Sequence, residues 1–150
     1  MKYMTKKWYN ACQLAADENM IRVLERVPKT YLREYKKSFP CPPDFMKAID
    51  TLHDCEVVSW RHNGQSYYLT MDHMGQGFDE FLQIAFKNAR IKKQDFENQH
   101  LGWCYDELYS TECGYELHVL FFEFGSNEMY DLIIECEDIE ISNFECNEEE

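Results

Sequence analysis

Two histidines and two aspartates are spaced so that a predicted β-hairpin would bring them together at its open end. Asn63-Gly64 separates two runs rich in β-branched and aromatic residues, which is typical of a two-residue hairpin turn. In that register Asp54 pairs with His73, while His53 and Asp72 lie one residue away. We therefore expect these four side chains to converge.

Imidazole and carboxylate groups together suit a divalent metal ion, or a general base that is oriented by an acid. The alternative is a polar strand end, with Asp54 closing one element and His73 starting a loop. The four residues lack HExxH or any other tight ligand spacing. Apart from such a metal the sequence predicts no cofactor, because Gly75-Gln76-Gly77 precedes no convincing helix, as a phosphate-binding loop would.

A second polar group is expected on two predicted strands nearer the carboxyl terminus. A turn of four or five residues after Tyr109 would place Asp106 opposite His118, with Glu116 on the same face. One interpretation is a core histidine that is hydrogen-bonded to a carboxylate, and the other is a ligand site. A turn one residue different would move the pairing to the other face and remove this cluster.

Charge is divided unevenly along the chain of 150 residues, whose formal net charge is −13. Lys93 is the last Lys or Arg, and 17 Asp and Glu follow it. This acidity argues against binding to nucleic acid or to an anionic membrane, since both are polyanions. It suits a basic protein partner, or simple solubility. The bases between residues 22 and 37 can pair with the acidic half within the fold, or head-to-tail in a homo-oligomer.

The cysteine pattern predicts reduced thiols. Seven cysteines are present, an odd number, and no pair has CxxC spacing. No apolar segment follows Lys6 and Lys7 as in a signal peptide, and no run of about 18 apolar residues predicts a membrane span. We therefore expect a cytoplasmic protein whose cysteines mostly serve as small apolar residues.

Helical periodicity dominates the first third of the chain. A helix is predicted from Thr5 to about Val27, with a kink or break near Asp17 and an end at Pro28. A second helix is predicted over 29–39, with Tyr31, Leu32, Tyr35 and Phe39 as its apolar face, and a third over 45–53, capped by Asp44.

After Asp54 the period changes to that of strands. The hairpin over 55–62 and 65–72 would pair Trp60 with Tyr67. Residues 78–96 fit either a helix or a strand with a bend near Asn88, and the alternation favours the strand. The remaining strands are predicted over 103–109, 115–124 and 129–137, with 139–141 as an extension past a bulge.

Helices first and strands second predict a single α+β domain over residues 1–142. About three N-terminal helices would pack on an antiparallel meander sheet of five or six strands. Residues 143–150 are predicted to be an acidic, flexible tail.

Several motifs resemble a bacterial family of uncharacterised proteins, domain of unknown function 4085. They are the opening nine residues, Leu52-His53-Asp54-Cys55, Phe86-Lys87-Asn88-Ala89, Trp103 to Tyr109, and Gly114 to Leu120. The resemblance spans most of the chain. It implies a bacterial cytosolic origin and a strand over 81–91, and it carries no assigned activity.

Three functions follow as hypotheses. The first is a non-enzymatic interaction domain whose acidic half docks a basic protein, as immunity or inhibitor proteins do. The second is a metal-binding domain or metal-dependent enzyme that uses His53, Asp54, Asp72 and His73. The third is a small-ligand module with a pocket between helices and sheet, for which the sequence gives no chemical clue to the ligand.

Overall fold

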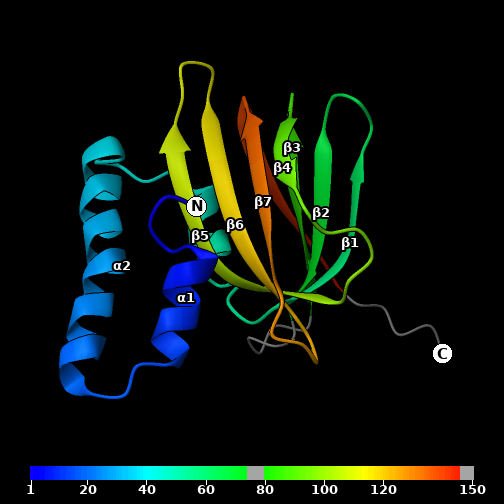
Figure 1. Ribbon diagram of the computed structural model, residues 1–150. Coiled ribbons are helices and arrows are strands. Elements are labelled where there is room, and N and C mark those ends of the chain that lie inside the picture. Colours follow the sequence, from blue (N-terminus) through cyan, green and yellow to red (C-terminus); the bar gives the residue numbers. More distant parts are fainter. Residues whose placement is uncertain (74–79, 146–150) are drawn as a thin grey trace.

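The computed structural model describes residues 1–73 and 80–145, and places helices beside one curved antiparallel sheet (Figure 1). The described helices are α1 (Lys6–Gln13), α2 (Glu18–Ser38) and α3 (Phe45–Ile49). The described strands are β1 (Glu56–His62), β2 (Tyr67–Asp72), β3 (Glu80–Lys87), β4 (Arg90–Gln94), β5 (Leu101–Ser110), β6 (Tyr115–Glu123), β7 (Met129–Cys136) and β8 (Asp138–Glu145). The predicted α+β class with an all-antiparallel sheet is confirmed.

The prediction of five or six strands is wrong, because the described sheet has eight, in the order β4-β7-β6-β5-β1-β2-β3-β8. Two strands that the pattern treats as continuous are each divided. Asn88 adopts a left-handed backbone conformation with φ of 48° between β3 and β4, which confirms the predicted bend. Glu137 lies between β7 and β8, and the strand beyond 137 matches the predicted extension.

The bent hairpin formed by these four strands joins the two ends of the sheet. Lys87 pairs with Asp138 and Arg90 pairs with Glu135, so the register continues unchanged across the bend. The amide of Glu137 donates to the carbonyl of Lys87 at 2.9 Å, which holds the bend together. Because β3 continues into β4 and β7 into β8, the sheet curls back on itself around one interior.

The main core fills this interior. Trp103, Tyr67, Phe86 and Phe121 are its largest fully buried side chains, and α3 contributes Met46 and Ile49. A smaller cluster of Cys104, Leu120 and Met129 lies on the outer face of β5, β6 and β7, beneath Met1 and Tyr9. Strand alternation explains the division, since neighbouring residues point to opposite faces.

The predicted break near Asp17 is confirmed, since α1 ends at Gln13 and α2 begins at Glu18, but the predicted helix end at Pro28 is wrong, because Pro28 lies inside α2. Asp17 caps α2 by accepting from the amide of Met20 at 2.9 Å. Pro28 has no N–H for the carbonyl of Leu24, four residues earlier. The indole N–H of Trp8 donates to that carbonyl at 2.8 Å, so α1 supplies the missing donor and α2 continues through the proline.

Helix α2 stands to one side of β5, with α1 next to it (Figure 1). No residue within α2 is buried, although Phe39 just beyond its end is. None of the described helices is long and apolar enough to cross a membrane. At the other end of the chain β8 runs three residues into the predicted tail, and residues 146–150 lie outside the described part.

Candidate ligand pocket

The β1–β2 hairpin has a different register from the predicted one. Trp60 pairs with Leu69 rather than Tyr67, and His62 pairs with Tyr67. The loop therefore has four residues, and Asn63 closes it by accepting from the amides of residues 65 and 66 at 3.0 and 2.7 Å. A bulge between residues 57 and 59 shifts the register again. The predicted pairing of Asp54 with His73 is therefore wrong.

The two histidines of the first candidate cluster turn to different neighbours. His53 Nδ1 lies 2.7 Å from the carbonyl oxygen of Cys104, and its Nε2 lies 3.6 Å from Asp54 Oδ1. His73 is buried, with Nε2 2.7 Å from Thr51 Oγ1. Asp72 pairs with Glu56 along β1. Within residues 1–73 and 80–145, no group of three or more His, Cys, Asp or Glu could hold a metal ion. Residues 75–77, which the sequence analysis judged unsuited to be a phosphate-binding loop, lie outside this part.

The second candidate cluster is divided between the two faces of the sheet. Ser110 pairs with Tyr115, which places Asp106 opposite Val119 and moves it to the inner face. Glu116 and His118 remain outside, with Glu116 Oε1 2.7 Å from His118 Nε2. The predicted pairing of Asp106 with His118 is wrong by one residue. The pairing of β5 with β6 starts at Ser110 rather than at Tyr109, so each residue of β5 lies opposite a residue one position further along β6.

Glu107, which the sequence did not single out, takes the position opposite His118. Its side chain is fully buried and accepts hydrogen bonds from the amides of residues 2, 3 and 4, at 2.9 to 3.3 Å. The hydroxyl of Tyr109 donates to the same carboxylate. Burial and the adjacent Glu107 raise the pKa of Tyr109. This carboxylate anchors the amino-terminal segment on the outer face of β5.

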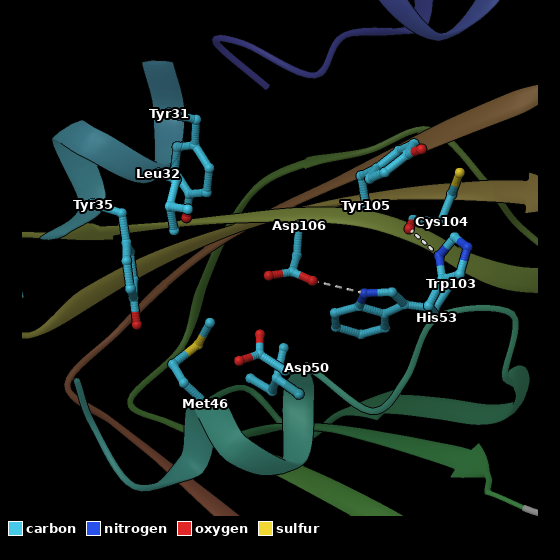
Figure 2. A pocket seen from close by; sticks show the side chains of 11 residues that line it. Tyr31, Leu32, Tyr35, Met46, Asp50, His53, Trp103, Cys104, Tyr105 and Asp106 are labelled. Atoms are coloured by element: carbon cyan, nitrogen blue, oxygen red, sulfur yellow. Dashed lines mark hydrogen bonds between the residues drawn. The ribbon is translucent and has the colours of Figure 1, made fainter. Parts of the chain in front are cut away.

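A pocket of about 370 Å³ opens between α2, α3 and β5 (Figure 2). The hydroxyl of Tyr31 links α2 to β5 at one side of the cavity. The amide of Leu108 donates to the hydroxyl oxygen of Tyr31 at 2.7 Å. Aromatic rings and a few polar groups line the cavity, among them Tyr31, Tyr35, Trp103, Tyr105, Asp50, His53 and Asp106.

Asp106 is the most perturbed acid in the pocket. Its Oδ1 accepts from the indole N–H of Trp103 at 3.0 Å. Burial raises the pKa of Asp106 to about 7, and the nearby Asp50 adds to the rise, whereas the Trp103 hydrogen bond opposes it. Figure 2 shows the Asp106 and Asp50 carboxylates on facing walls of the cavity. Burial raises the pKa of Asp50 as well.

The buried thiols Cys104 and Cys136 are unsuited to nucleophilic chemistry. Burial raises the pKa of Cys104, which lines the pocket, to about 12, and that of Cys136 to about 12. A thiol with such a pKa holds almost no thiolate at neutral pH. Six cysteines in the described part are free, three of them buried, and Cys146 lies outside it.

Within residues 80–145, several acids of the acidic half pair with bases from earlier in the chain. Strand β4 carries the last bases of the chain and pairs with β7, so these bases lie against later acids. Lys92 contacts Glu116 at 2.6 Å, and Lys93 contacts Asp131 at 2.8 Å. Further pairs are Arg90 with Glu135, Lys87 with Glu140, and Lys6 with Asp95. These pairs reduce the negative field that the sequence predicts.

The comparisons with known proteins give one match. A family model described as "Protein of unknown function (DUF4085)" matches residues 6–129. No curated protein and no solved structure matches the chain. Because the matched region covers most of the chain, and agrees with the motifs noted in the sequence, the chain belongs to this family of uncharacterised proteins.

Proposed function

We propose that this chain is a small-molecule binding domain, and that its ligand occupies the pocket between α2, α3 and β5. The observation that carries the proposal is a 370 Å³ cavity with aromatic walls and a perturbed carboxylate. Binding pockets are typically apolar and aromatic, with a few polar groups at fixed positions. The volume lies near the lower end of the usual range of about 300–1,000 Å³.

The polar groups in this pocket are held in place before any ligand arrives. Trp103 fixes one oxygen of Asp106, and the Leu108 amide fixes the hydroxyl of Tyr31. Such preorganisation reduces the entropy lost on binding. Binding is favoured over catalysis, because Cys104 has a high pKa and no other nucleophilic side chain with a paired base lines the cavity among the described residues.

A blocking variant tests this proposal. Leu32 lines the pocket and is 47% exposed, so Leu32→Trp should narrow the opening without disturbing the core. Val23 lies on the same helix with 57% exposure, and Val23→Trp is the matched control. A diverse collection of small molecules is screened by thermal shift, and the hits are measured by calorimetry. We expect hits that bind wild type and Val23→Trp alike and bind Leu32→Trp at least about tenfold more weakly.

Two results would contradict the proposal. One is a collection in which no compound binds the wild-type protein. The other is a set of hits whose affinities are unchanged in Leu32→Trp, because such ligands would occupy another site.

The docking of a basic protein is the second candidate function. Its support is the 17 Asp and Glu after Lys93, of which Glu97, Glu112 and Glu128 are exposed. Attraction between opposite charges would raise the association rate and weaken with salt. A pull-down at low and high ionic strength tests it, and a partner whose capture is indifferent to salt would count against it. Both functions suit a cytosolic protein, where these cysteines stay reduced.

A further inference from the structure

We propose that the pocket ligand is an organic cation, carrying an ammonium or guanidinium group that lies between Asp106 and Asp50. This inference rests on the proposed function and adds the chemical class of the ligand. Three features of the cavity lead to it: the sign of its charges, the nature of its walls, and the protonation of its acids.

The described residues that line the pocket include two acids, Asp50 and Asp106, and one base, His53. Asp50 approaches from α3 and Asp106 from β5, and no Lys or Arg is found among the described residues that line the cavity. An anionic ligand would have to lie beside two carboxylates without a Lys or Arg as counterion, which is unfavourable in a partly buried site. A cation placed between them would relieve their mutual repulsion.

The walls suit a cation that is also partly apolar. Tyr31, Tyr35 and Trp103 present aromatic rings to the cavity. The faces of such rings attract ammonium and guanidinium groups, and Trp is the strongest of them. A hard metal ion instead needs six or more oxygen ligands, or octahedral water, and the pocket offers only two carboxylates. The pocket therefore favours an organic cation over a metal ion.

The binding of a cation would change the protonation of the pocket acids. Burial, followed by the charges of Asp50 and Glu107, raises the pKa of Asp106, whereas Trp103 and His53 lower it. The other titratable groups facing it are Tyr31 and Tyr35 from α2, and Cys104 and Tyr105 from β5. A bound cation stabilises the ionised carboxylate, so binding near neutral pH should release a proton.

Three probes of similar shape test the charge preference: phenethylamine, phenethyl alcohol and phenylpropionate. They are titrated into the protein by calorimetry at pH 6, 7 and 8, in two buffers with different ionisation enthalpies. We expect phenethylamine to bind at least about tenfold tighter than the alcohol, and phenylpropionate to bind weakest. The affinity for the amine should rise about tenfold from pH 6 to pH 8, with proton release detected between the two buffers.

A matched pair of variants separates the pocket acid from general surface charge. Asp106→Asn keeps the shape and an oxygen that can accept from Trp103, and Glu112→Gln removes an exposed charge from the β5–β6 turn. Asp106→Asn should lose most of the amine affinity and all of its pH dependence, and Glu112→Gln should lose neither. Thermal melting confirms that both variants are folded.

The cation can belong to a free amine or to a side chain of a basic peptide, and the chemistry is the same. A short lysine-rich peptide therefore forms a further arm, and competition between it and phenethylamine would place both in this pocket. Stronger binding of the alcohol or the anion, or no binding of any cationic probe, would overturn the assignment of charge. The wider screen with Leu32→Trp decides separately whether the pocket binds ligands at all.

Discussion

Trp103 donates its indole N–H to Asp106, although the two residues lie three positions apart in the same strand. Residues three apart in a regular strand point to opposite faces. A bulge between residues 103 and 105 removes this alternation and turns both side chains into the pocket. The bulge thus turns the Trp103 donor to the face on which the β5–β6 register already places the Asp106 carboxylate.

This pairing predicts the effect of Trp103→Phe. The variant keeps an aromatic ring but loses the donor, and this hydrogen bond lowers the pKa of Asp106. We therefore expect the pKa of Asp106 to rise further above 7. A carbon NMR titration of the carboxyl group measures it, with Trp60→Phe as a control that leaves the pocket unchanged. An unchanged or lower pKa would show that the hydrogen bond has no such role.

The pKa of Asp106 also predicts how stability depends on pH. It is about 7 in the folded protein, against about 3.9 in an unfolded chain. Between these values the folded state binds more protons, so the free energy of unfolding should fall as pH rises from about 4 to 7. Asp50 contributes in the same direction.

Asp106→Asn should remove part of this decline. Relative to wild type, we expect the variant to gain on the order of 2 kcal/mol between pH 4 and pH 8. Urea denaturation at several pH values measures the difference. Parallel stability curves for the two proteins would contradict the prediction.

Removal of the Glu107 carboxylate should strongly destabilise the outer face of the sheet. Glu107→Ala leaves three amides and a tyrosine hydroxyl without their acceptor, and should cost about 2–4 kcal/mol. Glu107→Gln should cost less, because its amide oxygen still accepts. Chemical denaturation gives the cost, and hydrogen exchange should show faster exchange at residues 2–4. The exposed control Glu112→Gln should change stability by less than about 0.5 kcal/mol.

The contact between α1 and Pro28 predicts a coupling that a double-mutant cycle can measure. Trp8→Phe should cost about 1 kcal/mol, since the carbonyl of Leu24 loses its donor. Pro28→Ala restores a main-chain N–H to that carbonyl, so the same change at Trp8 should cost less in that background. Equal costs in both backgrounds would mean that the indole is not replacing the missing helix bond.

The sequence predicted those features that depend on local pattern. The order of helices and strands, the bend near Asn88 and the strand beyond residue 137 follow from hydrophobic period and turn residues. The division of the helices was only partly predicted. The donor that lets α2 continue through Pro28 comes from α1, and no local pattern reveals it.

The candidate sites depended on register, which the sequence determines less well. Asn63-Gly64 lies in a four-residue loop, and one residue at the β5–β6 turn moved Asp106 from one face to the other. The pocket was expected only as a general possibility. The pocket arises because α2 stands beside β5. The Tyr31 hydroxyl holds α2 there, but the sequence pattern places Tyr31 on the apolar face of a helix and does not reveal this role.

The short outermost strand β4 has a consequence for solubility. It has five residues, and Arg90, Lys92 and Lys93 are three of them. A strand from another molecule that paired with β4 would have to remove water from these charges. Short, charged edge strands therefore oppose the addition of further strands to the sheet. A chain that is 45% hydrophobic is thereby protected from fibre formation at one of the two edges of its described sheet.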